Sequence, residues 1–235
     1  MTGTRSPWLL AFAAMSVVHL ALNVAGASPW DSITKCLIMP LLAVWVLTES
    51  GPRIIVLALV ASTVGDFFLE FEGLITFGMA AFAAAHVCFI SFFLSRGALG
   101  QLRKKPWIGV IYVAAAIALV SYVWSGLENG MLPLVPVYAA LLAGTAATSL
   151  ATDLCAGIGG ALFLVSDGII ALDLANKGTP QPVQFWIMAS YIVALLLLSA
   201  GILNRENGTR AAGPGIDPTF RTDGWPRMEA VRSDE

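Results

Sequence analysis

The chain has 235 residues, of which 57% are hydrophobic and only 12% are charged, and its mean hydropathy is +0.80. A soluble domain of this size has about a quarter of its residues charged, so most of this surface must face something other than water. The formal net charge of −2 provides no basic face for phosphate backbones, which excludes a nucleic-acid-binding protein. The composition instead predicts an all-α, polytopic membrane protein.

Eight apolar segments predict transmembrane helices, since a span needs about 20 mostly apolar residues. In chain order they cover residues 8–26, 33–48, 53–70, 73–95, 106–124, 132–150, 157–175 and 183–203. The connections are short and rich in turn-forming or charged residues, so neighbouring helices are expected to be antiparallel in one bundle. We therefore expect a bundle over residues 1–203 and a disordered cytoplasmic tail over 204–235, because the tail cannot bury enough surface to fold.

The Lys and Arg residues predict the orientation of this bundle. With eight spans, eleven of the thirteen lie on the side of the termini, and only Lys35 and Lys177 lie on the other. The positive-inside rule then places both termini in the cytoplasm, and a bacterial cytoplasmic (inner) membrane fits this pattern. An alternative for the first segment is a signal peptide cleaved after Ala25-Gly26-Ala27, which would leave seven helices. That segment is long for a signal peptide and contains a histidine and an asparagine.

Sites for metals, disulfides and nucleophilic serines are not encoded in recognisable form. The three cysteines, Cys36, Cys88 and Cys155, show no zinc-binding or disulfide spacing. Only two histidines, His19 and His86, are present, fewer than a three-histidine zinc site needs. A G-x-S-x-G motif is also missing. We expect neither a metal nor a cofactor.

Two aspartates lie deep in apolar segments, where an ionisable side chain costs at least about 2.5–3.5 kcal/mol on insertion scales. Asp66 follows Val64-Gly65 and precedes Phe67-Phe68, and Asp167 follows Leu162-Phe163-Leu164-Val165-Ser166. Their helices run in the same direction, and both residues fall in the outer half of the bilayer, about one and two turns from the helix ends. They can therefore share one cavity, or each can bond a neighbouring helix. Glu70, Glu72 and Asp173, close to helix ends, are expected to be solvated.

Other polar residues can support such a site. Lys35, at the same outer level, is either a snorkelling interfacial lysine or a partner for a carboxylate or an anionic head group. Asn23 is close to that level, and Ser166 precedes Asp167. Gly78, Phe82 and His86 recur every four residues on one helical stripe, where glycine permits close helix contact. His86 is either a packing residue or a group that orients an acid.

Four short motifs in order resemble the YhhN-like, or lysoplasmalogenase, membrane proteins. They are Lys35 with Met39-Pro40-Leu41-Leu42, Gly65-Asp66-Phe67-Phe68-Leu69, the Gly78–Phe82–His86 stripe, and Leu162-Phe163-Leu164-Val165-Ser166-Asp167. The resemblance covers residues 33–203 and not the tail. It departs at Phe89, where the family often has tyrosine.

The resemblance implies an integral-membrane hydrolase that cleaves the vinyl-ether bond of lysoplasmalogens, a class of lysophospholipid. The products are a fatty aldehyde and glycerophosphoethanolamine or glycerophosphocholine. Such a reaction needs a protonated acid to protonate carbon and a carboxylate to activate water, which predicts Asp66 and Asp167 as the catalytic pair. Lys35, His86, Asn23 and Ser166 are the predicted supporting residues.

Two other classes remain open from the residues alone. A transporter or lipid-translocating protein can use Asp66, Asp167 and Lys35 as an ion or proton relay. An accessory membrane protein can pair the same acids with another subunit. The release of aldehyde by purified protein separates these classes from an enzyme.

Overall fold

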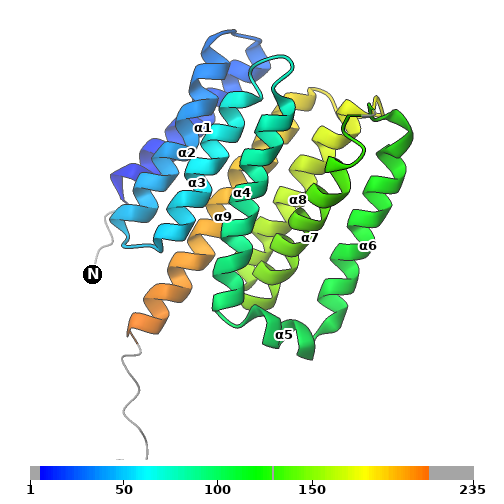
Figure 1. Ribbon diagram of the computed structural model, residues 1–235. Coiled ribbons are helices and arrows are strands. Elements are labelled where there is room, and N and C mark those ends of the chain that lie inside the picture. Colours follow the sequence, from blue (N-terminus) through cyan, green and yellow to red (C-terminus); the bar gives the residue numbers. More distant parts are fainter. Residues whose placement is uncertain (1–5, 129, 212–235) are drawn as a thin grey trace, which may run out of the picture.

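The computed structural model describes residues 6–128 and 130–211 (Figure 1). Over these residues the chain forms nine α-helices and one 3-10 turn at Trp124–Gly126, and no strand. The helices are α1 (Pro7–Ala25), α2 (Trp30–Thr48), α3 (Arg53–Phe68), α4 (Ile75–Ser95), α5 (Ala98–Lys104), α6 (Pro106–Val123), α7 (Leu134–Thr152), α8 (Leu154–Leu174) and α9 (Val183–Ala211). The expected all-α class is confirmed.

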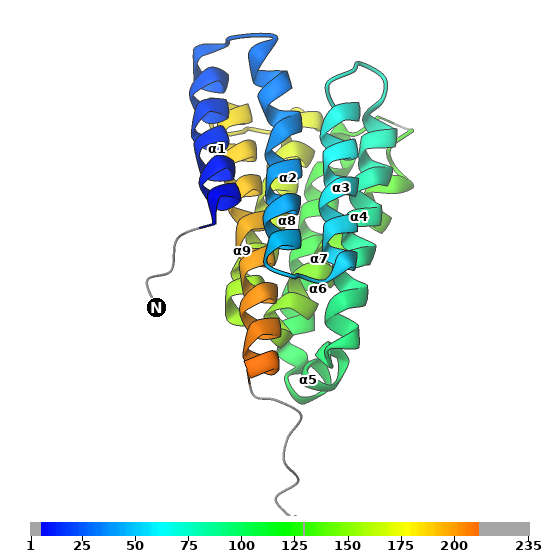
Figure 2. The same cartoon turned by 90° about the vertical axis from the view of Figure 1, so that its left-hand side faces the viewer.

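Of the nine described α-helices, eight have 16 or more residues and α5 has seven. The long helices run alongside one another, and α5 lies at one end of the bundle (Figures 1 and 2). Among the described helices, seven are long and apolar enough to cross a membrane, and α3, with 16 residues, is shorter than these. At about 1.5 Å per residue, α3 still extends roughly 24 Å, most of a hydrocarbon core. The expectation of about eight membrane helices therefore agrees with the structure.

The expected connection over residues 96–106 contains a helix that the sequence pattern did not predict. Gly97 turns the chain with a φ of 87°, and α5 follows at once. Ala98 at its start is fully buried, so this turn is anchored to the bundle by packing. Pro106 then begins α6, because proline suits the first position of a helix.

The last helix continues to Ala211, past the expected end at residue 203. Polar contacts with other parts of the bundle hold this extension. Arg205 donates to the carbonyl of Thr152 at 2.6 Å, and Arg210 donates to the carbonyl of Ser50 at 2.8 Å. The predicted tail boundary is therefore wrong, because these contacts stabilise helix beyond the apolar run. The rest of the predicted tail, residues 212–235, lies outside the described residues.

Small residues let α8 and α9 pack with their backbones in contact. A Cβ atom at Gly159 would lie 2.7 Å from the carbonyl oxygen of Ala194, and one at Gly201 would lie 2.6 Å from the backbone nitrogen of Ala156. Such close approach is a common way for membrane helices to associate. It fixes α9 against α8, and α9 also contacts α1 and α2. This arrangement holds one face of α9 close to the helices that carry Asp66 and Asp167.

The expected stripe on α4 also packs as predicted. A Cβ atom at Gly78 would lie 2.9 Å from Leu69, and a Cβ atom at Gly65 would lie 2.6 Å from the ring of Phe82. Both contacts bring α3 and α4 together. As expected, α3 and α8 run in the same direction, and the α3–α4 turn and the end of α8 lie together at the top of Figure 1. Asp66 and Asp167 therefore approach each other from parallel helices.

Candidate functional site

Asp66 lies two residues before the end of α3, and the residue is only 2% exposed. The hydroxyl of Tyr191, on α9, donates a hydrogen bond to its Oδ2 at 2.9 Å. Tyr191 is itself buried and packs edge-on against Phe82 and Phe163. The aromatic packing fixes the tyrosine, and the tyrosine fixes the carboxyl group.

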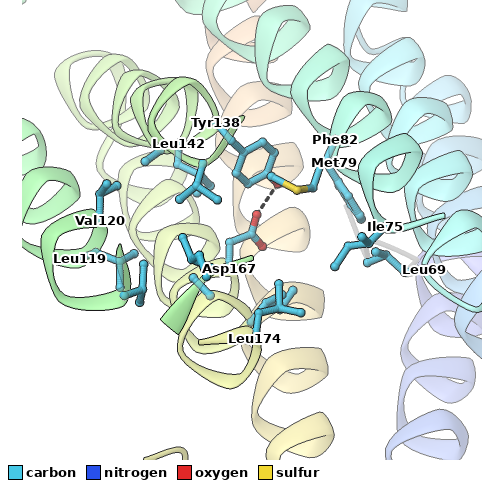
Figure 3. Close-up of a pocket in the computed structure, with 16 residues that line it drawn as sticks. Leu69, Ile75, Met79, Phe82, Leu119, Val120, Tyr138, Leu142, Asp167 and Leu174 are labelled. Atoms are coloured by element: carbon cyan, nitrogen blue, oxygen red, sulfur yellow. Dashed lines mark hydrogen bonds between the residues drawn. The ribbon is translucent and has the colours of Figure 1, made fainter. Parts of the chain in front are cut away.

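Asp167 lies on α8 and is paired in the same way from another helix. The hydroxyl of Tyr138, on α7, donates a hydrogen bond to Oδ2 of Asp167. Figure 3 shows this bond, with apolar side chains on either side of the carboxyl group. Each aspartate thus has a tyrosine donor from a helix other than its own.

Both carboxyl groups line one cavity of about 220 Å³. A cavity needs about 10–15 Å³ on this scale to hold one water molecule, so several fit. Lys35, Ser166 and Asp173 also line it. The structure therefore brings together the two aspartates and the lysine that the sequence pattern singled out, and it leaves room beside them for water or substrate.

Lys35 forms an ion pair with Glu70, with 2.7 Å between Nζ and Oε1. Glu70 is an exposed residue, as expected, but its carboxylate is also paired, and the side chains of Lys35 and Glu70 are 14% and 24% exposed. Glu70 lies outside the helices, in the turn between α3 and α4. Partial burial raises the pKa of Glu70, but hydrogen bonds and attraction from Lys35 outweigh it, and the pKa lies below its usual value. Glu70 is therefore anionic at neutral pH.

A second, mostly polar cavity of about 220 Å³ opens around this ion pair, and we call it the polar vestibule. Its polar lining consists of His19, Asn23, Asp31, Ser32, Lys35, Glu70 and Gln184. It shares Lys35, Leu69, Gln184 and Met188 with the cavity of the two aspartates. The two spaces are therefore adjacent, with Lys35 on their common wall.

On the other side of Asp167 lies an apolar pocket of about 70 Å³. It shares Asp167, Phe82 and Leu174 with the cavity of the two aspartates. Its remaining walls come mainly from α6 and α7, with Leu119, Val120 and Leu142 facing the carboxyl group of Asp167 across the pocket (Figure 3). A polar vestibule, a pair of acids and an apolar pocket thus follow one another through this end of the bundle.

The other predicted supporting residues lie around these spaces with different roles. Asn23 lines the polar vestibule but is not part of the lining of the acid cavity. Ser166 lines the acid cavity, yet its hydroxyl donates to the carbonyl of Ile187 at 3.0 Å. That bond holds α8 to α9 and occupies the hydroxyl proton.

His86 is fully buried, and its Nδ1 lies 3.0 Å from the hydroxyl of Thr145. It packs against Phe163 and edge-on against Tyr138, the residue that donates to Asp167. Its nearest polar partner is therefore Thr145, not an acid as one hypothesis proposed. His86 thus touches the donor to Asp167 through its ring contact with Tyr138.

Sequence reasoning missed the two tyrosines. A signal was available, because all four tyrosines of the chain, Tyr138 and Tyr191 among them, lie inside apolar segments. A buried tyrosine hydroxyl normally needs a hydrogen-bond partner. The carboxyl groups of Asp66 and Asp167 are the natural acceptors, but which tyrosine meets which aspartate depends on packing.

The carboxyl groups are not gathered into a metal-binding set. Across residues 6–128 and 130–211, no group of three or more His, Cys, Asp and Glu side chains lies close enough to hold a metal ion. The arrangement instead offers acids that can exchange protons beside a cavity with room for several water molecules.

Comparison with known proteins connects this site to a family. The profile of the YhhN family matches residues 30–202, which include every helix around the two aspartates. The chain is 31% identical to lysoplasmalogenase TMEM86B of Homo sapiens over 202 residues, which are 83% of this chain and 86% of the relative.

Two further relatives have the same activity in their names. The identity is 30% over 229 residues to lysoplasmalogenase TMEM86A of Bos taurus, covering 86% of this chain and 92% of the relative. It is 32% over 176 residues to a lysoplasmalogenase of Mycobacterium tuberculosis, covering 69% and 65%. No solved structure matches the chain.

Proposed function

The chain belongs to the YhhN family, and from this membership we propose that it is a membrane-embedded hydrolase of the vinyl-ether bond in lysoplasmalogens. Relatives at 30–32% identity carry the name lysoplasmalogenase. The observation that supports the chemistry is the shared cavity of Asp66 and Asp167, which lies between a polar vestibule and an apolar pocket. A relay in a transporter has no comparable support.

The order of the three spaces matches the order of groups in the substrate. A lysoplasmalogen has a charged head group, then glycerol, then the vinyl-ether bond, then an alkyl chain. With the head group in the polar vestibule and the alkyl chain in the apolar pocket, the vinyl ether lies in the cavity between Asp66 and Asp167. The carbon farther from the ether oxygen then lies toward Asp167, which borders the apolar pocket. The carbon bonded to oxygen lies toward Asp66.

This placement assigns a different task to each acid. Two carboxyl groups that line one cavity within the bundle are most easily accommodated when they share one proton. Protonated Asp167 donates that proton to the outer carbon of the double bond, forming a carbon–hydrogen bond and an oxocarbenium ion. The carboxylate of Asp66 stabilises this cation and removes a proton from the attacking water, giving a hemiacetal.

Collapse of the hemiacetal restores both groups. Asp66, now protonated, donates to the glycerol oxygen as its bond to carbon breaks, and the hemiacetal hydroxyl returns its proton to Asp167. One water molecule is consumed, and a fatty aldehyde and a glycerophospho-head group are released. The cycle needs no other proton source, and the hydrogen bonds from Tyr138 and Tyr191 hold each carboxyl group in place throughout.

The experiment is an aldehyde assay on purified chain in detergent, with lysoplasmenylethanolamine as substrate and without any ion gradient. We expect catalytic release of aldehyde in equal amount with glycerophosphoethanolamine. A matched lysolipid with a saturated alkyl ether should yield no aldehyde, because it has no double bond to protonate. Absence of turnover with the vinyl ether would contradict the proposal and favour the alternative of a transporter.

We further propose that the α5 end of the bundle faces the cytoplasm of a bacterial inner membrane. The described cations at this end lie in the α2–α3 turn, around α5 and on the end of α9, whereas Lys35 and Lys177 lie at the other end. The positive-inside rule supports this orientation. The acid cavity then lies in the outer half of the bilayer. A C-terminal green fluorescent fusion should fluoresce, and a periplasmic phosphatase fusion that is active instead would contradict the orientation.

A further inference from the structure

The polar vestibule contains hydrogen-bonding atoms that the proposed chemistry does not use. His19 is 1% exposed, lines the vestibule, and its Nε2 has no hydrogen-bond partner within the described residues. Oδ1 of Asp31, on the same wall, is also buried without a partner there. A buried polar atom without a partner costs free energy, so two such atoms beside one cavity indicate a ligand that satisfies them.

The hydrogen bonds of His19 determine what its free nitrogen offers. Its Nδ1 lies 3.1 Å from the carbonyl oxygen of Asp31 and 3.0 Å from the hydroxyl of Thr34. A carbonyl only accepts, so Nδ1 carries the proton and donates it. In the neutral ring Nε2 then presents a lone pair. The free atom on His19 is therefore an acceptor, like the free carboxylate oxygen of Asp31.

The charges around the vestibule favour a ligand with both signs. Lys35 uses one of its three N–H donors on Glu70, and the others remain for an anion. Two carboxylates, Asp31 and Glu70, outnumber this one lysine in the lining. A phosphate alone would meet one favourable and two unfavourable charges. A phosphate joined to an ammonium group meets partners for both.

We propose that the polar vestibule is a head-group site that prefers phosphoethanolamine over phosphocholine, with Lys35 on the phosphate and His19, Asp31 and Glu70 on the primary ammonium. This proposal rests on the proposed function and adds its head-group preference. A primary ammonium has three N–H donors, which match the acceptors on His19 and Asp31 and the carboxylate of Glu70. The trimethylammonium of choline has no N–H donor and leaves those buried acceptors without partners.

The first test compares kcat/KM for lysoplasmenylethanolamine and lysoplasmenylcholine with the same alkenyl chain, using the full purified chain. Loss of hydrogen bonds to a charged group predicts a preference of about ten- to a hundredfold for ethanolamine. Equal values for the two lipids in the wild-type protein would overturn the proposal.

Variants then connect the preference to named atoms. His19→Asn retains a donor near the Nδ1 position and removes the Nε2 acceptor, and Asp31→Asn removes a charge without changing shape. Each should bring the ethanolamine-to-choline ratio toward one, and His19→Gln, which places an oxygen near the Nε2 position, should recover part of it. Glu72→Gln is the matched control, because Glu72 is exposed on the same turn as Glu70 and outside the vestibule lining. An unchanged ratio in both His19→Asn and Asp31→Asn would overturn the assignment.

Binding measurements separate failure of this site from failure of the proposed function. If neither lipid is hydrolysed, the stable alkyl-ether analogues of the two lipids are titrated instead. Tighter binding of the ethanolamine analogue supports the head-group site even though the proposed function fails, and equal binding overturns the site. Free phosphoethanolamine should displace the lysolipid analogue only weakly. Displacement as strong as by the lipid itself would overturn the assignment of a lipid ligand.

Discussion

The two ends of the bundle both carry an ion pair with a 2.7 Å separation, but the pairs have different surroundings. Lys35 and Glu70 lie beside a polar cavity that adjoins two buried acids. Arg96 and Glu206, at the opposite end, join the end of α4 to α9. There, Arg205 also binds the carbonyl of Thr152. The Lys35–Glu70 pair therefore lies beside a cavity, whereas the Arg96–Glu206 pair joins the ends of two helices.

This difference suggests a way to distinguish charged residues that bind a ligand from charged residues that only stabilise the helix bundle. A charge that only closes a helix end has its partners in the backbone or on a neighbouring helix. A charge beside a cavity, close to polar atoms without partners, has capacity left for a ligand. Substitutions at the two ends of the bundle should therefore have different consequences for catalysis and for stability.

Replacement of either cavity aspartate should have the largest effect. Asp66→Asn and Asp167→Asn each remove a proton donor or acceptor, and such groups contribute about 10²–10⁴-fold to a rate. We expect a loss of this size in kcat for aldehyde release, and the double variant should lose little more than either single one because the pair acts as a unit. Glu72→Gln serves as the control. Full activity in both aspartate variants would contradict the two-acid mechanism. Normal elution on size exclusion shows that the variants are folded.

The tyrosines should come next. Tyr191→Phe and Tyr138→Phe each remove a hydrogen bond to a buried carboxyl group while keeping the ring. The loss of such a bond costs about 1.5–3 kcal/mol, which predicts a fall of roughly ten- to a hundredfold in kcat/KM. Tyr112→Phe on α6, outside the lining of the three spaces, should retain wild-type activity. Equal kcat/KM values for the two site variants and the Tyr112→Phe control would show that Tyr138 and Tyr191 do not position the aspartates.

The apolar pocket should control chain length. Leu119→Trp adds bulk on the α6 wall of the pocket, opposite Asp167 (Figure 3). Burial of each methylene contributes about 0.8 kcal/mol, so the exclusion of two carbons should lower kcat/KM for long-chain substrates by roughly tenfold. Shorter chains should be less affected. Ile111→Trp, on the exposed face of the same helix, is the control. An equal loss of kcat/KM for substrates of all alkyl-chain lengths would show that the alkyl chain does not bind in this pocket.

The two ion pairs provide the mildest test and the most direct comparison between the ends. Lys35→Met should raise KM for lysolipid about tenfold with little change in kcat, since it removes uniform binding of the phosphate. Arg96→Met should leave kinetics unchanged and lower stability by only about 0.2–1 kcal/mol, as is usual for exposed pairs. Thermal unfolding in detergent measures the second effect. A kinetic defect in Arg96→Met equal to that in Lys35→Met would remove the distinction between the ends.

Periodicity and charge predicted much of this architecture, because both act locally along the chain. Apolar segments indicated the long helices, and the cost of burying Asp66 and Asp167 identified them as unusual. Their parallel helices followed from topology alone. The predicted helix end at residue 203 failed because contacts from Arg205 and Arg210, rather than hydropathy, extend α9.

The partners of the buried acids could not be predicted in the same way. Tyr191 and Asp66 are 125 residues apart, so no local pattern connects them. Glu70 looked like an ordinary turn residue until the fold placed Lys35 beside it. His86 had the position of a functional histidine, but Thr145 on α7 is its polar partner. Contacts between distant helices decide these details.

The stereochemistry of deuterium incorporation into the released aldehyde shows whether a fixed acid protonates the vinyl ether. The wild-type protein is incubated with a lysoplasmalogen in D₂O, and the aldehyde is reduced at once to the alcohol to prevent exchange. If a fixed carboxyl group, Asp167, protonates the outer carbon of the vinyl ether, each product molecule should carry one deuterium at the carbon next to the former aldehyde, in a single configuration. An equal mixture of the two configurations, or no deuterium at that carbon, would contradict protonation by an acid fixed in this cavity.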